Sequence, residues 1–279
     1  MSEEPVSRTC LFCGKAADTQ EHVFPNWVND LYPAYTLGGV RADMLHVVPE
    51  RTEMRSYRAD EVASLSARAV CGSCASGWMS RLEKAARPIL KPLILSQPRT
   101  LSMAEQLLAA TWAVKTAIVS EAIMQYPDRF PPEDCAIVRE QQRPPGRLRV
   151  AIAAFAPLGG THVFTRYIRL LNGRYRDEAP VVDAYVHTIQ IGALVLQLRG
   201  PDVLSATDNR ASERPAVTRD VEIPIFPPVE QRDWPPDAIL DEDVLIRYAA
   251  GGAELPDLSR AKPISGTRAT NDSSPGQAA

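Results

Sequence analysis

Four of the five cysteines form two pairs with the same internal spacing, a pattern typical of zinc sites. The pairs are Cys10-Leu-Phe-Cys13 and Cys71-Gly-Ser-Cys74, and 57 residues separate them. Each tight turn presents two thiolates, and four thiolates complete the tetrahedral shell of a structural zinc ion. Two disulfides or a thioredoxin-like redox pair are the alternatives, but a cytoplasmic chain disfavours disulfides and neither pair opens a βαβ pattern. We therefore expect zinc on these four cysteines, joining the ends of a long inserted segment.

Glu21 and His22 are a second pair of residues whose side chains could take part in catalysis. They open the segment Glu21-His22-Val23-Phe24-Pro25-Asn26-Trp27, shortly after the first cysteine pair. A neutral imidazole accepts a proton near neutral pH, and a carboxylate beside it holds Mg²⁺ through oxygen. Phosphodiester hydrolysis needs such a base and such a cation. An isolated Glu-His pair is more often a surface or capping feature, so the flanking cysteine pairs carry the prediction that this one is catalytic.

These motifs together resemble a known nuclease family. The order Cys-x-x-Cys, Glu-His-Val-x-Pro-x-Trp and Cys-x-x-Cys-x-x-Gly-Trp-Met is similar to bacterial HNH endonucleases, the ββα-metal or His-Me finger nucleases, in their form with two cysteine knuckles. The resemblance covers roughly the first 90 residues. It implies a zinc-stapled ββα-metal module with a treble-clef-like fold, and it implies a metal-dependent endonuclease that hydrolyses DNA.

The resemblance also implies a role for each matching residue. The four cysteines hold structural zinc, Glu21 binds a catalytic Mg²⁺ or Mn²⁺ ion, and His22 is the general base. Two positions depart from the family pattern. Ala75 stands where the family has an Asn or His ligand, and Ser66 is the nearest equivalent of an Asn that the family often has shortly before the second cysteine pair. The candidates to replace the missing ligand are Ser76, Ser80 and Glu83.

Two further hypotheses follow from this departure. The alternative function is a zinc-stabilised nucleic-acid-binding or regulatory protein whose nuclease site is degenerate, because alanine has no ligand atom. In a third interpretation the zinc module is a protein-interaction surface and the function lies in the region that follows it.

The charge distribution is strongly uneven, although the net charge is only −3. Residues 62–100 carry a net charge of +5, residues 139–178 also +5, and residues 202–257 carry −8. Basic segments of this kind can face phosphates. Together with the resemblance to HNH endonucleases, they make DNA the expected partner. Ordinary solvated surface in an arginine-rich chain is the alternative. The residues expected to contact nucleic acid are Arg68, Arg81, Lys84 and Arg87.

The remaining pattern predicts an α+β fold in three regions. Residues 1–98 form the zinc-knuckle HNH-like module, residues 99–256 a long helix packed on an antiparallel sheet, and residues 257–279 a disordered tail. The helix starts at a capping box of Ser102 and Glu105, ends at Pro127, and is apolar enough to be a core helix rather than a site.

Alternation predicts strands near residues 148–152 and 162–171, the second closed by an Asn172-Gly173 turn. Residues 185–198 are expected to form one long strand, broken or bulged at Gly192. The proline-rich stretches 127–145 and 224–236 are expected to be loops, and Cys135, which lies in the first, a bystander.

The other histidines and tryptophans have simpler expected roles. His46 is expected in packing or at the surface, and His162 and His187 as hydrogen-bonded structural residues in strands. Trp27 and Trp78 are expected in the core of the zinc module rather than as base-stacking platforms. No apolar run approaches the roughly 18 residues of a membrane span, and the polar start carries no signal sequence. We expect a cytoplasmic protein without membrane contact.

Overall fold

The computed structural model describes residues 9–31, 40–48, 51–59, 66–123, 130–156, 161–170, 182–200, 221–249 and 262–263. The expected turn at Asn172-Gly173, the helix stop at Pro127 and most of the expected disordered tail lie outside these residues. Within the tail, the described Lys262–Pro263 forms β13, which pairs in parallel with β3 (Arg51–Ala59).

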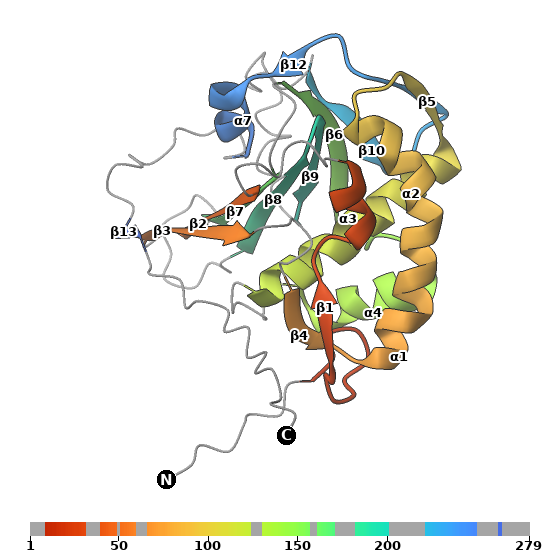
Figure 1. The fold of residues 1–279 in the computed structure, drawn as a ribbon, viewed down its shortest axis with the longest axis vertical. Helices are drawn as coiled ribbons and strands as arrows, with labels where there is room; N and C mark the ends of the chain where they lie inside the picture. Colours follow the sequence, from red (N-terminus) through yellow and green to blue (C-terminus); the bar gives the residue numbers. More distant parts are fainter. Residues whose placement is uncertain are drawn as a thin grey trace, which may run out of the picture.

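The chain is a mixed helix and sheet structure, as predicted, with most helices on one side of a large sheet (Figure 1). The helical elements are η1 (Asn26–Leu31), α1 (Gly72–Cys74), η4 (Ala75–Met79), α2 (Ser80–Ile94), α3 (Met103–Ile123), α4 (Pro132–Gln141) and α7 (Glu242–Ala249). The other strands are β1 (Thr19–His22), β2 (Val40–Val48), β4 (Ser66–Val70), β5 (Arg99–Ser102), β6 (Arg149–Phe155), β7 (Thr161–Leu170), β8 (Val182–Ile191), β9 (Leu194–Arg199), β10 (Ile223–Phe226), β11 (Gln231–Trp234) and β12 (Ile239–Leu240).

In the part of the chain that the structure describes, the large sheet has nine strands, and its middle is buried on both faces. The order is β10-β6-β9-β8-β7-β2-β3-β13, with β12 parallel to β6. Neighbours from β10 to β7 are antiparallel, whereas β2 joins β7 in parallel. On β6, Ile152 and Ala154 pack toward α3, and Ala153 and Phe155 pack in a second cluster with α7. Burial on both faces makes these strands nearly continuous apolar runs.

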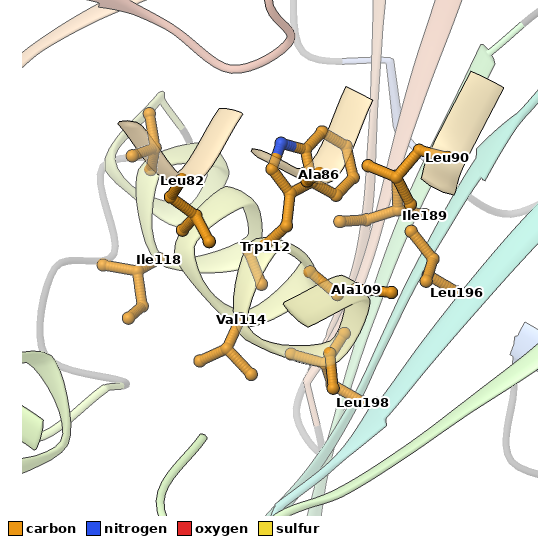
Figure 2. Packing of buried hydrophobic residues seen from close by; sticks show 14 of the residues in the cluster. Leu82, Ala86, Leu90, Ala109, Trp112, Val114, Ile118, Ile189, Leu196 and Leu198 are labelled. Atoms are coloured by element: carbon orange, nitrogen blue, oxygen red, sulfur yellow. The ribbon is translucent and has the colours of Figure 1, made fainter. Parts of the chain in front are cut away.

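The predicted long helix is α3, and its start is the predicted capping box. The Ser102 hydroxyl donates to Oε2 of Glu105 (2.8 Å) and also accepts the Glu105 backbone N–H (3.4 Å). Residues 109–121 are all buried, which confirms a core helix. Figure 2 shows side chains of α2, α3, β8 and β9 meeting in one cluster, with Trp112 of α3 pointing toward Ala86 and Leu90 of α2.

The expected break at Gly192 is present, but it separates two paired strands instead of interrupting one. A two-residue turn at Gly192-Ala193 reverses the chain and pairs Ile191 with Leu194. Gly192 has φ 56°, a conformation that glycine adopts without steric cost. A bulge would have left one strand; the positive φ instead completes a hairpin.

The proline-rich stretches also contain regular structure. Pro132 begins α4, where proline fits because the first helical N–H needs no partner, and acidic residues follow it in the first turn. Residues 224–236 contribute to β10 and form β11, which pairs with β5. Among the described residues, no helix combines the length and the apolar character that crossing a bilayer requires.

Candidate metal centre and the Glu-His pair

The first cysteine pair lies in a tight turn that is docked onto β4. Gly14 donates its backbone N–H to Cys10 O (2.9 Å), and Cys10 N–H donates to Lys15 O (2.6 Å). Gly14 has φ 71°, which closes the turn at little cost only for glycine. Between the two thiols, Leu11 N–H donates to Ala69 O of β4 (3.0 Å). The turn therefore has a fixed position next to the strand that leads to the second pair.

The second pair lies at the start of a helix whose first N–H is held by an aspartate. Cys74 N–H donates to Cys71 O (3.0 Å), and Gly72 N–H donates to Oδ1 of Asp18 (2.7 Å). That backbone hydrogen bond is the main reason why the pKa of Asp18 is lowered. A Cβ at Gly72 would lie 3.2 Å from Thr19 Oγ1, so glycine allows this close approach. Asp18, directly before β1, thus ties the two halves of the centre together.

The four thiols converge. The sulfur atoms of Cys10, Cys13, Cys71 and Cys74 all lie within 4.8 Å of one another, and Cys13 Sγ is 3.5 Å from Cys71 Sγ. A Zn–S distance of about 2.3 Å in tetrahedral geometry gives S–S separations of about 3.8 Å. None of these cysteines is in a disulfide. The donor set and its spacing therefore fit one metal ion, with zinc as the ion that four thiolates favour.

The thiols of the centre differ in how their pKa values are shifted. Burial raises the pKa of Cys10, and it raises the pKa of Cys74 to about 12. The pKa of Cys71 is lowered to about 6, chiefly by the Ser73 hydroxyl 3.1 Å from its sulfur. A metal binds thiolates, so it must displace the protons of the buried thiols.

The aromatic residues around the centre are packing residues, as predicted. Trp78 and Trp27 are buried, and the rings of Phe12 and Trp78 meet edge to face with centroids 5.0 Å apart. Cys135 is buried on α4, apart from the four-thiol cluster, and burial raises its pKa to about 12. The side chains of His46 and His162 lie outside the described residues.

Glu21 and His22 are the last two residues of β1, which is antiparallel to β4. Glu21 pairs with Ala67, and His22 with Ser66. Successive side chains of a strand point to opposite faces, and here Glu21 is half-buried whereas His22 is exposed. Among the described residues we find no hydrogen bond to the His22 ring. The Ser66 hydroxyl accepts a hydrogen bond from the Gln20 amide (2.9 Å).

The Glu21 carboxyl lies in a charged environment formed by two helices. Burial raises its pKa, the charge of Lys115 on α3 lowers it, and the charge of Glu83 on α2 raises it. Lys115 is fully buried, and its ammonium donates to Oε1 of Glu83 (2.7 Å). Glu83 was a candidate ligand from the sequence, whereas Lys115 was not a candidate site residue. The available signal was that Lys115 is the single charged residue in the run from Ala109 to Val119.

The positions that depart from the family pattern have these surroundings. Ala75 is half-buried at the start of η4, and the neighbouring Ser76 hydroxyl donates to Gly72 O (2.7 Å). In the described part of the chain, the four-cysteine group is the only set of three or more Cys, His, Asp or Glu side chains close enough to share an ion. The structure therefore does not gather Glu21, His22 and a third acidic or histidine ligand at one point.

The four predicted nucleic-acid contacts are all exposed. Arg81, Lys84 and Arg87 follow one another at three-residue spacing on α2, and Arg68 lies on β4 near Asp18. The Arg87 guanidinium lies 5.8 Å from the centroid of Trp27 on η1, the element that follows His22. In the second basic segment, Arg147 is instead paired with Asp134. The basic face of α2 is thus next to the segment that leads away from the Glu-His pair.

Comparison of this chain with protein families, with curated proteins and with solved structures gave no match.

Proposed function

We propose that the protein is a metal-dependent endonuclease of the HNH type, which hydrolyses phosphodiester bonds of DNA. One observation carries the proposal: the Glu21-His22 end of β1 is paired with β4, and β4 leads through Cys71 into α2. This strand–strand–helix order, with a four-thiol centre at the junction, is the arrangement that the ββα-metal resemblance implies. The treble-clef-like description of the module is part of the same proposal.

The residues of the chain have separable roles in this reaction. The exposed His22 imidazole accepts a proton from water, whose oxygen then bonds to phosphorus while the bond from phosphorus to the leaving oxygen breaks. Glu21 would hold the divalent ion, which supplies charge neutralisation at the phosphate when bound. The zinc would stabilise the module that carries Glu21 and His22 and would take no part in the reaction.

The basic face of α2 would contact the flanking phosphates. Arg81 and Lys84 are exposed. Contacts of this kind position DNA without reading its sequence. They therefore support a nucleic-acid substrate, whichever base sequence is cut.

A second function is favoured by a specific observation. Ala75 has no ligand atom, and the described residues hold no second cluster of three acidic or histidine ligands. A zinc-stabilised nucleic-acid-binding or regulatory protein with a degenerate nuclease site would have these features.

Plasmid nicking with added Mg²⁺ or Mn²⁺ separates the two functions. The wild type should nick supercoiled DNA, and His22→Ala should lower the rate by about 100-fold or more, because the base acts in the transition state. Gln20→Ala is the matched control, since Gln20 shares the exposed face of β1. DNA binding without cleavage would favour the second function, and cleavage that is equal in His22→Ala would contradict the role of His22 as the base.

A further inference from the structure

A buried indole N–H beside the four-thiol centre has no partner at ordinary hydrogen-bond geometry. Trp78 lies on η4, four positions after Cys74, and only 7% of its surface is exposed. Its Nε1 atom is buried and has no hydrogen-bond partner among the described residues. Burial of a donor without an acceptor is costly, so an unpaired N–H at this place needs an explanation.

The Trp78 ring lies against the turn of the first cysteine pair. It meets the Phe12 ring edge to face with centroids 5.0 Å apart, and Phe12 lies between Cys10 and Cys13. The backbone supports this placement through a π-helical turn, η4, which departs from helical geometry at Gly77. Such turns occur frequently at functional sites. Trp78 therefore follows the second cysteine pair in the chain and contacts the first pair in space.

Cys74 is the acceptor that this position favours. Its thiol is buried, and burial raises its pKa to about 12, whereas the Trp78 side chain works in the opposite direction. A neutral thiol is a weak acceptor, but a thiolate accepts a charge-assisted hydrogen bond. Because a metal ion binds the thiolate, binding makes Cys74 a stronger acceptor for the same N–H.

The other cysteine of the second pair also has a side-chain donor beside it. The Ser73 hydroxyl lies 3.1 Å from Cys71 Sγ and is the chief cause of the lowered pKa of that thiol. Ser73 is exposed, so its hydroxyl approaches the centre from the solvent side, whereas Trp78 approaches from the core. Each thiolate of the second pair can therefore be hydrogen-bonded by its own side chain.

We propose that Ser73 and Trp78 are positioning residues of the metal centre, which donate hydrogen bonds to the thiolates of Cys71 and Cys74 when the ion is bound. Donors of this kind orient the ligand atoms and draw negative charge from them. Both residues act through the ligands and contact no substrate. Their roles therefore stand whether or not the chain cleaves DNA.

Cobalt bound to the full chain in place of zinc reports on these hydrogen bonds, because thiolate-bound Co²⁺ has sulfur-to-metal charge-transfer bands. Trp78→Phe keeps an aromatic ring and removes the N–H, so the sulfur becomes more electron-rich and the bands should move to longer wavelength. Competition with a chelator should show zinc bound about 10-fold or more weakly. Trp27→Phe is the matched control, because Trp27 is also buried with an unpaired N–H on η1, and it should leave the bands in place.

Ser73 is tested by a pair of substitutions. Ser73→Ala removes the hydroxyl and should move the bands in the same direction as Trp78→Phe. Ser73→Thr keeps a hydroxyl at the same position and should restore the wild-type bands. If Trp78→Phe does not fold, benzothienylalanine at position 78 takes its place, because it keeps the two-ring shape and lacks the N–H.

The outcomes separate hydrogen bonding from packing. Shifted bands in Trp78→Phe and Ser73→Ala, with unshifted bands in Trp27→Phe and Ser73→Thr, support the proposal. Folded, cobalt-loaded Trp78→Phe and Ser73→Ala with wild-type bands would overturn it, even if they bind zinc more weakly, because both residues would then contribute packing alone. Cleavage that depends on His22 is measured separately, so neither result decides the proposed function.

Discussion

At the scale of single residues, Glu21 is held in an environment that opposes its own charge. Burial raises its pKa above the ordinary value of 4.5, and Glu83 raises it further, although Lys115 acts in the other direction. The folded protein therefore binds this proton more tightly than the unfolded chain does. The stability that the protonated carboxyl contributes is present below pH 4.5 and is lost as the pH rises through the folded-state pKa. At neutral pH the ionised Glu21 destabilises the fold.

Glu21→Gln should therefore stabilise the protein at pH 7.5 without added divalent ions. We expect the midpoint of thermal unfolding to rise by roughly 1–3 °C, because the amide keeps the shape and removes the buried charge. Differential scanning fluorimetry measures the midpoint, with Glu133→Gln as a control that should not move it. An unchanged or lower midpoint in Glu21→Gln would mean that Lys115 already compensates the charge in full.

The residues of the candidate site differ in how far the sequence could predict them. The four cysteines were predictable because metal-ligand spacing is a local pattern, and their sulfur atoms do converge. Lys115 was not predictable, because its partner Glu83 is 32 positions away in the sequence and on another helix. Helical periodicity identifies α3 as buried, but it does not say which buried cation finds which acid.

At the scale of elements, α3 is fixed to the sheet by a buried polar contact as well as by apolar packing. His187 on β8 lies with Nδ1 3.0 Å from Glu121 Oε1 and Nε2 3.2 Å from the Ser120 hydroxyl. Ser120 donates its own proton to Ala117 O (2.8 Å), so the hydroxyl is engaged within the helix. All three side chains are buried, which confirms the expectation of a hydrogen-bonded structural histidine at this position.

Replacing His187 should show how much this contact contributes to the stability of the fold. His187→Leu should lower the free energy of unfolding by about 2–4 kcal/mol, because the buried Glu121 carboxyl loses its contact with the imidazole ring. The double variant Glu121→Leu/His187→Leu should recover part of that loss, since both polar groups are then gone. Urea denaturation measures both values. Additive losses in the double variant would show that the two side chains do not depend on each other.

Elements were predictable where one local signal decided the outcome. Ser102 and Glu105 located the start of α3 because a capping box acts over four residues. Pro132 was misinterpreted as part of a loop, although a proline followed by two acids also begins a helix. At Gly192 the apolar run continues on both sides, so periodicity did not distinguish one strand from a hairpin buried on both faces.

At the scale of the whole molecule, the basic residues are concentrated in two segments of the sequence, of which the first includes α2. If the basic face of α2 contacts phosphates, Arg81→Glu/Lys84→Glu should weaken DNA binding regardless of sequence and reduce its salt dependence. These two residues are chosen because Arg87 also contacts Trp27. Fluorescence anisotropy at several salt concentrations measures the affinity, and Arg232→Glu, in the acidic segment 202–257, is the control. Equal affinity in the double variant would identify these residues as ordinary surface.

The four-cysteine centre connects the N-terminal turn, β1, β4 and α2, and the largest buried cluster contains residues of this module together with α3 and the sheet. This continuity could not be predicted from composition, which suggested separate regions on either side of residue 98. The proposed boundaries at residues 98 and 256 remain predictions. Loss of the metal is expected to unfold at least the module, because the binding free energy of a structural zinc ion contributes directly to folding.

Elemental analysis of the purified protein, with mass spectrometry of its cysteines, tests the central claim that this centre holds structural zinc. We predict about one zinc ion per chain, four cysteines that resist alkylation until a chelator is added, and loss of structure after chelation. Cys135 serves as the internal reference, because it lies apart from the cluster and its reactivity should follow unfolding rather than metal content. A fully folded protein without zinc, or one with a Cys10–Cys13 disulfide, would contradict the account.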